Sequence, residues 1–410
     1  MAELPRSRRE RIPPSKRLNR RRSLWHFGSG EITVALSVAV AVVWCALVVV
    51  VSFRQPVLGG DFMEFYTFGM AARLGDWAIQ YDWPAFHQLQ VSLVPNSDPY
   101  FYPPSYPPLV PALYAPLSFL AFPTAYVVWT GLSTGIYCGL TALAARAATF
   151  SRRNAVLALL LFPPFIAHQA LGHSTLWPLI GFVGGWWALT HTRPAIAGVI
   201  FSLVAIKPHL GMALAIALLA TRQWRTVGGI AIGLTLQACA TVAICGTAAV
   251  AAYLSTTLRV LSDTGIINPT DSRFSHGLRT SLEAVLPHTL ASAGWIMASA
   301  TFGWLLVRAW RRSEDWTLRI STLLVATLLI SPHVQAYDAI LLAPAALWLS
   351  SWAVSKRQPA VLVVVVLLSA AFVVPVARLW GFPLTVPLMA WLLWQCQRAV
   401  PRPEAVQALG

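Results

Sequence analysis

The sequence predicts an all-α protein, a polytopic membrane bundle of about twelve transmembrane helices. Of its 410 residues, 57% are hydrophobic and 11% are charged, whereas a soluble domain carries about 25% charged residues. The mean hydropathy is +0.62. Apolar segments recur along the chain with short polar connectors between them. A single transmembrane domain over residues 31–400 therefore accounts for nearly the whole protein.

The N-terminal tail is strongly basic. Nine Lys or Arg residues lie between Met1 and Arg22, against Glu3 and Glu10, in a chain with a net charge of +15. A basic segment ahead of an apolar span is typical of a cytoplasmic anchor attracted to anionic lipids. We therefore expect residues 1–30 to form a disordered cytoplasmic tail. No basic surface with interleaved aromatic residues follows, which disfavours nucleic-acid binding.

The first span is predicted over Ile32–Phe53. It is too long for a cleaved signal peptide and lacks the A-x-A-like end of one, so we expect an uncleaved helix that starts in the cytoplasm. The five cysteines stand in apolar runs and form no C-x-x-C pair. We expect them to be packed in the core, without disulfides or a metal site.

Twelve further apolar segments follow the first span. They cover residues 106–122, 124–146, 154–168, 174–190, 195–206, 208–220, 226–250, 288–309, 317–331, 338–352, 360–377 and 383–397. Their connectors alternate between a basic kind and a kind rich in Pro, His, Asp and Tyr. Placing the basic connectors and a short tail over 401–410 in the cytoplasm gives twelve spans with both termini inside. This topology requires the proline-rich segment 106–122 not to cross completely.

Two of these segments are too short to cross a bilayer alone. A helix of the length of 195–206 or 208–220 rises about 18–20 Å, against a hydrocarbon core of about 30 Å. The two segments should meet at Lys207-Pro208 below the membrane surface. A lysine at that depth is tolerated where it lines a polar cavity or has an anionic partner, either a carboxylate or a lipid phosphate.

Polar residues gather on the outer face that this topology predicts. They are Asp61, Glu64, His87, Tyr102, His173, Lys207, His209, His276, Arg279, His333 and Asp338. An interfacial belt would explain the aromatic residues and some of the histidines. It would not explain charged residues beside helix-breaking prolines, so we expect a functional cavity on this face.

Structural roles remain open for several of these residues. Asp61 follows Gly59-Gly60 and could cap a helix that starts at Phe62, and Asp338 could cap the helix that follows it. Arg279 and His333 could simply extend from the interface.

Two outer loops are predicted, over residues 54–105 and 251–287. Within the first, Phe62–Leu74 is expected to form an amphipathic helix lying in the membrane interface. The aromatic and proline-rich stretch 100–108 should be stiff and extended. Aromatic rings near a cavity suit the faces of sugars and also lipid headgroups.

Five motifs resemble glycosyltransferase family 87. They are Gly-Asp-Phe at 60–62, Tyr-Pro-Pro at 102–104, Gly-His at 172–173 where the family usually has Gly-Gln, Lys-Pro-His at 207–209, and Ser-Pro-His-Val-Gln-Ala-Tyr-Asp at 331–338. The resemblance covers about residues 30–350. It implies the GT-C fold and an integral enzyme of the bacterial cytoplasmic membrane. Such an enzyme transfers a hexose, here mannose, from a polyprenyl-phosphate donor to a glycolipid or glycan acceptor on the outer face.

The resemblance implies Asp61 as the general base. Inverting transfer needs a carboxylate that accepts the proton of the attacking hydroxyl, and cations that stabilise the departing phosphate. The predicted phosphate ligands are Lys207, Arg279 and His333, with His209 and His276 as further candidates. Glu64, Tyr102 and Asp338 complete the predicted substrate-binding set. There is no D-x-D motif of the kind that holds a metal-bound nucleotide sugar, so we expect no metal or cofactor requirement.

Two other functions fit a polytopic chain with buried charge. A secondary transporter or lipid-linked-sugar flippase should show inverted repeats and polar residues on both faces of the cavity. No convincing repeat relates the two halves, and the polar motifs gather on one face. A non-catalytic assembly factor should tolerate simultaneous substitution of Asp61 and Lys207.

Overall fold

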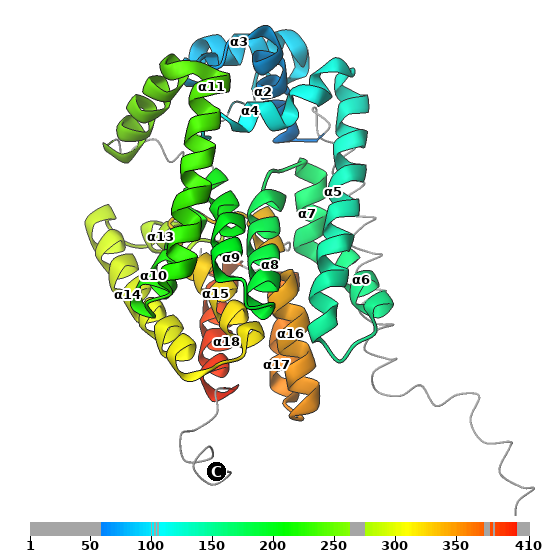
Figure 1. The fold of residues 1–410 in the computed structure, drawn as a ribbon, viewed down its shortest axis with the longest axis vertical. Coiled ribbons are helices and arrows are strands. Elements are labelled where there is room, and N and C mark those ends of the chain that lie inside the picture. Colours follow the sequence, from blue (N-terminus) through cyan, green and yellow to red (C-terminus); the bar gives the residue numbers. More distant parts are fainter. Residues whose placement is uncertain are drawn as a thin grey trace, which may run out of the picture.

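The computed structural model describes residues 59–99, 101, 104, 106–262, 275–372, 378–379 and 382–399. The basic tail, the first span Ile32–Phe53, Tyr102 and the C-terminal tail lie outside these residues. The described part is an elongated helical bundle with a layer of short helices at one end (Figure 1). Apart from two short strands, β1 (Arg378–Leu379) and β2 (Phe382–Pro383), which pair antiparallel, its regular elements are helices. The all-α prediction is therefore confirmed.

The layer of short helices, which we call the head, comprises residues 59–119. It contains α2 (Phe62–Leu74), η2 (Ile79–Tyr81), α3 (Trp83–Leu93), η3 (Pro95–Ser97), α4 (Val110–Tyr114) and η4 (Ala115–Phe119). Prolines stand in the first turn of α3, η3, α4 and η4, where the missing N–H costs nothing but where a preceding helix must end. Residues 106–122 accordingly do not form a spanning helix.

The α2 helix has the predicted bounds but a different environment. Ten of its 13 residues are buried, and the Phe65 ring stacks on Tyr114 with centroids 4.9 Å apart. Its aromatic residues point in several directions around the helix axis, so each side needs a packing partner. The prediction of an amphipathic helix on the membrane interface is therefore wrong: α2 packs inside the head.

The bundle below the head contains the remaining helices. They are α5 (Phe122–Ala144), η5 (Ala145–Ala147), α6 (Arg152–Leu160), α7 (Pro163–Leu171), α8 (Leu176–Thr190), α9 (Pro194–Phe201), η6 (Ser202–Ile206), η7 (Pro208–Gly211), α10 (Met212–Ala220), α11 (Trp224–Ser262), α13 (Leu278–Glu283), α14 (His288–Arg312), α15 (Trp316–Ile330), η8 (Ala336–Leu341), α16 (Leu342–Ser355), α17 (Pro359–Ala371) and α18 (Thr385–Ala399). Each apolar segment predicted after the first span contains one or two of the described helices.

Four described helices are long and apolar enough to cross a membrane. They are Phe122–Ala147, Trp224–Val260, His288–Arg312 and Ala336–Ser355. A fifth span is possible if α6 and α7 form one, bent by 56° where Pro163-Pro164 interrupts the helical hydrogen bonds. Six further apolar helices are shorter. The predicted count of about twelve spans is not confirmed.

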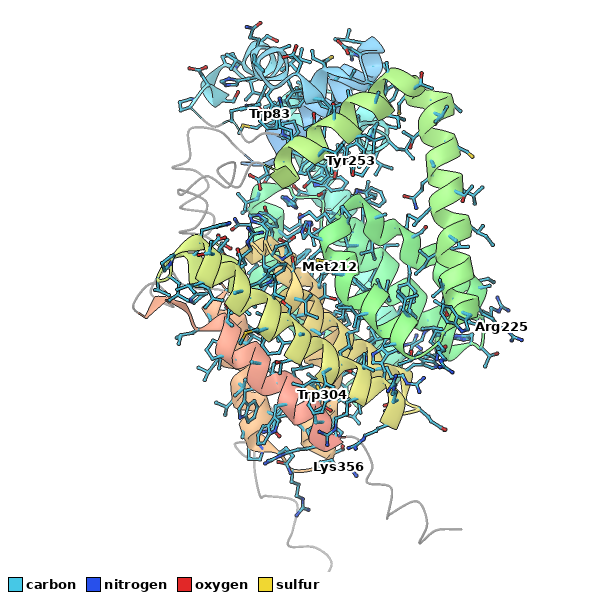
Figure 2. All side chains as sticks on the ribbon, turned by 90° about the vertical axis from the view of Figure 1, so that its left-hand side faces the viewer. Trp83, Met212, Arg225, Tyr253, Trp304 and Lys356 are labelled. Atoms are coloured by element: carbon cyan, nitrogen blue, oxygen red, sulfur yellow. The ribbon has the colours of Figure 1, made fainter. Side chains whose placement is uncertain are left out.

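The α11 helix departs from the sequence prediction at its C-terminal end. The apolar segment was expected to end at residue 250, but the helix continues to Ser262 through a kink at Gly246, whose φ is 78° and ψ is 166°. Beyond the kink it crosses the head, where the Tyr253 ring lies 5.9 Å from Tyr81 and Arg259 lies 4.3 Å from the Trp83 ring. Figure 2 shows Trp83 and Tyr253 close together at this end.

The core of the bundle surrounds α15, in which every residue from Ile320 to Ile330 is buried. Neighbouring helices α8, α10, α14, α16 and α18 pack around it. Arg225 and Lys356, from two basic connectors, lie far from the head (Figure 2). Of the cysteines in the described residues, Cys245 and Cys396 are buried and Cys138 is partly buried. Cys239 is exposed, so the expectation of a packed core position is wrong for that residue.

Candidate functional site

A two-glycine turn positions Asp61 at the start of α2. Gly59 and Gly60 have φ values of 81° and 44°, a region that residues with a Cβ rarely adopt. The Asp61 side chain makes no capping hydrogen bond to α2, so the structure contradicts the N-cap interpretation. Its carboxylate Oδ2 instead lies 3.8 Å from Nε2 of His173, and the side chain remains 18% exposed.

His173 joins three parts of the chain that are distant in sequence. It follows α7 directly and is 3% exposed. Its ring stacks on Tyr337 of η8, with centroids 3.6 Å apart and planes at 12°, and contacts the Phe65 ring of α2 edge-on at 5.3 Å. Its Nδ1 lies 3.2 Å from Oγ1 of Thr175, and its Nε2 lies 3.4 Å from the hydroxyl of Tyr106.

Behind His173 lies a buried ion pair. Nζ of Lys207 donates to Oδ1 of Asp338 at 2.7 Å and to Oγ1 of Thr175 at 3.0 Å. The Thr175 hydroxyl donates to the same Asp338 oxygen at 2.8 Å. Lys207 is 5% exposed and Asp338 is fully buried. Since an isolated buried charge is very costly, each of these residues compensates the other.

Asp338 also holds the turn on which it stands. Its Oδ2 accepts from the backbone N–H of Gln335 at 3.0 Å, and the two residues form a capping box at the start of η8. The expectation that Asp338 caps the helix after it is not met, because Gln335 is the N-cap of η8 and Asp338 is its third residue. The Asp338 carboxylate supports this turn from within η8 in addition to forming the ion pair. Of the two anionic partners that the sequence left open for Lys207, a carboxylate or a lipid phosphate, the structure shows the carboxylate. The Lys207 ammonium also lies 4.9 Å from the Tyr337 ring centroid.

Gly172 ends α7 in a left-handed conformation and so positions His173, which follows it. Its φ is 59°, and a Cβ there would lie 2.6 Å from Cβ of Phe62. Gly75 provides a matched control because it has a φ of 79° with no atom within 4 Å of its Cβ position. We expect Gly75→Ala to cost about 1 kcal/mol through backbone strain alone, whereas Gly172→Ala should cost clearly more through the added clash. Melting temperatures of the two detergent-solubilised variants test this, and equal losses would contradict the packing described for Gly172.

Buried Glu64 and partly buried Tyr106 add two acids whose pKa values are raised. Burial, reinforced by the charge of Asp61, raises the pKa of Glu64 well above its usual range, with Lys207 partly opposing the shift. Burial together with Glu64 likewise raises the pKa of the Tyr106 phenol. Ser174 Oγ donates to the Tyr106 hydroxyl at 3.1 Å.

Two of the predicted histidines lie beside this cluster. His209 follows Lys207-Pro208, and its ring centroid is 6.5 Å from that of His333. Among the described residues, Nε2 of His209 is buried without a hydrogen-bond partner. Both histidines act electrostatically on His173, so they belong to the same polar region.

The remaining predicted residues have partners of their own. Arg279 on α13 pairs with Glu283 at 3.0 Å and lies 5.6 Å from the Trp295 ring. His276 lies 3.3 Å from the Thr385 hydroxyl and contacts the Phe372 ring. Their segment is tied to the site by the backbone, since Ser275 bridges Gln335 and the N–H of His276 donates to the carbonyl of Val334. His87, also predicted on this face, is separately engaged with Asp98 at 3.7 Å.

Sequence reasoning missed Thr175 and Tyr337 as members of the site. Thr175 Oγ1 contacts His173, Lys207 and Asp338, yet a threonine two residues after Gly-His carries no distinctive sequence signal. Tyr337 belongs to the motif at 331–338, but the sequence predicted no function for it. Within the described residues, no group of three or more His, Cys, Asp or Glu side chains could hold a metal ion, and independence from metal stays a prediction.

The fold and the site define a helical membrane protein with a carboxylate, a buried ion pair and several imidazoles at one end. The model of glycosyltransferase family 87 matches residues 105–332. The match covers more than half of the chain, which therefore belongs to this family, and the resemblance noted from its motifs is confirmed. Comparisons with curated proteins and with solved structures found no match.

The matched range contains His173, Lys207, His209, His276 and Arg279, while Asp61, His333 and Asp338 lie outside it. Family membership makes the protein a membrane glycosyltransferase with a sugar donor and an acceptor.

Proposed function

We propose that this glycosyltransferase moves a hexose, specifically mannose, from a polyprenyl-phosphate donor to a hydroxyl of a glycolipid or glycan acceptor. The reaction takes place on the outer face of the bacterial cytoplasmic membrane, with inversion at the anomeric carbon and without a metal. The sugar, the donor and the stereochemistry come from the family resemblance. The observation that carries the proposal is the position of Asp61, a partly exposed carboxylate beside a buried polar network.

Asp61 is the proposed general base. Its carboxylate takes the proton from the acceptor hydroxyl as that oxygen attacks the anomeric carbon of the donor sugar. The bond between this carbon and the phosphate oxygen breaks, and its electron pair leaves on the polyprenyl phosphate. Because burial raises the pKa of Glu64 while Asp61 remains partly exposed, we propose Asp61 as the base of this pair.

The departing phosphate is proposed to bind at His209 and His333. The buried Nε2 of His209 has no partner among the described residues, and an anion would supply one. We propose that Lys207 contributes mainly through the field of its charge, because Asp338 and Thr175 already take two of its three N–H donors. Arg279, His276, Glu64 and Tyr102 remain proposed substrate contacts.

The proposed topology directs the head to the exterior. One transmembrane domain of about twelve spans over residues 31–400 would place both termini in the cytoplasm, with outer loops at 54–105 and 251–287. The distance of the basic-connector residues Arg225 and Lys356 from the head (Figure 2) supports this orientation under the positive-inside rule. Membrane lipids are the expected surroundings, and the oligomeric state is left open.

The proposal is tested with purified protein in micelles, polyprenyl-phosphate-[14C]mannose and a panel of glycolipid acceptors. A radiolabelled product formed with this donor, and not with GDP-mannose, is the expected result. Proteoliposomes loaded with the same donor test the transporter or flippase alternative. Movement of label across the membrane without any covalent product would replace the proposal with that function.

A further inference from the structure

The hydrogen bonds behind His173 determine which of its two ring nitrogens carries the proton. Thr175 Oγ1 lies 2.8 Å from Asp338 Oδ1. Because both are oxygens and the carboxylate has no proton, the single hydroxyl proton must point to Asp338. Lys207 donates into one lone pair of Thr175. Thr175 can then only accept from His173, so the imidazole proton lies on Nδ1.

The other ring nitrogen is therefore a hydrogen-bond acceptor. Burial, together with the nearby charge of Lys207, lowers the pKa of His173 well below its usual range, which favours the neutral imidazole. With the proton on Nδ1, the Nε2 lone pair faces the Tyr106 hydroxyl at 3.4 Å and Asp61 Oδ2 at 3.8 Å. Ser174 donates to the Tyr106 oxygen, which leaves the phenol proton free to point to Nε2.

A nitrogen that can only accept cannot form a hydrogen bond to an ionised carboxylate, which also only accepts. In agreement, Asp61 Oδ2 and His173 Nε2 are 3.8 Å apart, which is longer than a hydrogen bond. Once Asp61 has gained a proton, its O–H can donate to Nε2 and displace the weaker phenol donor. The contact thus becomes favourable only as the proton arrives. Interactions that strengthen on the way to the transition state are those that accelerate a reaction.

We infer that neutral His173 is a positioning residue for Asp61, which accepts a hydrogen bond from the Asp61 carboxyl group as that group takes the proton of the acceptor hydroxyl. The proton moves from the hydroxyl oxygen to Asp61, and His173 gains or loses none. This role rests on the proposed function of Asp61 as general base. It gives a purpose to the histidine that stands where the resemblance leads one to expect glutamine.

Other groups also face this pair and set its background field. They are Glu64 on α2, Tyr106 before α4, His168 on α7, Lys207 and His209 before α10, and His333, Tyr337 and Asp338 around η8. None of these differs between the wild type and a His173 variant. A change in the pH profile of that variant therefore reports the contact with Asp61.

The first test is the dependence of kcat on pH for His173→Gln. The amide of glutamine can donate to ionised Asp61, which Nε2 cannot, so the variant should stabilise the carboxylate and weaken the base. We expect the acidic limb of the profile to move about one pH unit lower, the size expected for one hydrogen bond, and kcat to fall roughly three- to tenfold. The KM for the donor should stay unchanged.

The matched control is His168→Gln. His168 is fully buried, and both of its ring nitrogens lack hydrogen-bond partners among the described residues, so this variant also replaces a buried imidazole by an amide. Its acidic limb should move much less than that of His173→Gln, because His168 contributes to the background field and not the ring nitrogen beside Asp61. If the limb of His173→Gln stays at the wild-type pH or moves higher, the inference is overturned.

A second measurement needs no substrate. The 15N spectrum of histidine-labelled wild type in liposomes, minus that of His173→Gln, isolates the His173 imidazole. We expect a neutral ring protonated on Nδ1 at the pH of maximal activity, and protonation on Nε2 or on both nitrogens would overturn the inference. Full activity of Asp61→Asn would instead defeat the proposed function, so the two failures are distinguishable.

Discussion

Asp61→Asn should abolish turnover while leaving the donor bound. The substitution keeps the size of the side chain but removes the base that takes the acceptor proton, a loss of about 10²–10⁴-fold in rate. Donor affinity should change little because the proposed phosphate ligands are elsewhere. The measurement is initial rate with saturating polyprenyl-phosphate-mannose, together with donor affinity from equilibrium binding of the labelled lipid.

Asp76→Asn is the control for this experiment. Asp76 also lies in the head, where its Oδ1 accepts from the N–H of Ile79 at 3.1 Å, a bond that an asparagine oxygen can keep. Its activity should match the wild type within about twofold, since exposed substitutions of this kind have small effects. An Asp61→Asn enzyme with wild-type kcat would show that Asp61 is not the base.

The second large effect concerns stability. Lys207→Met should strongly destabilise the protein because it leaves Asp338 charged in the interior, and breaking a buried pair from one side costs about 3–5 kcal/mol. The double variant Lys207→Met/Asp338→Asn removes both charges and should recover part of this loss. A double-mutant cycle of melting temperatures in detergent measures the coupling between the two residues.

Lys356→Met serves as the reference, because Lys356 is an exposed residue of a basic connector. This variant should have the melting temperature of the wild type. The same experiment separates a structural lysine from a substrate ligand. If Lys207→Met melts at the wild-type temperature but binds the donor weakly, Lys207 is a direct phosphate ligand, and the structural account of the pair is contradicted.

The helices were predictable because their signals are local. Apolar runs and the prolines between them gave the approximate positions of the described helices other than η2, α3, η3 and α13, and α2 was predicted with its observed bounds. The environment of α2 was not predictable, since the aromatic residues that cover it come from α4 and α5. The α11 helix changes direction at Gly246 and then continues across the head. This change depends on the backbone conformation of one residue, and a hydropathy pattern does not detect it.

The candidate site was predictable as a set of residues but not as a set of pairs. The carboxylate just after the first predicted span indicated Asp61, and charged residues in proline-containing motifs indicated Lys207 and Asp338, because charge at a membrane is rare without function. Which carboxylate would neutralise Lys207 depended on the tertiary packing that brings the turn between η6 and η7 against η8, since Lys207 and Asp338 are 131 residues apart. Thr175 became part of the site for the same reason.

The central claim, direct displacement at the anomeric carbon with Asp61 as base, is tested most directly by product stereochemistry. One turnover of a donor with known anomeric configuration would be analysed by NMR, with polyprenyl phosphate quantified in the same sample. The account predicts a product of inverted configuration and one equivalent of released polyprenyl phosphate, with neither formed by Asp61→Asn. A product of retained configuration, or product formation by Asp61→Asn at the wild-type rate, would contradict it.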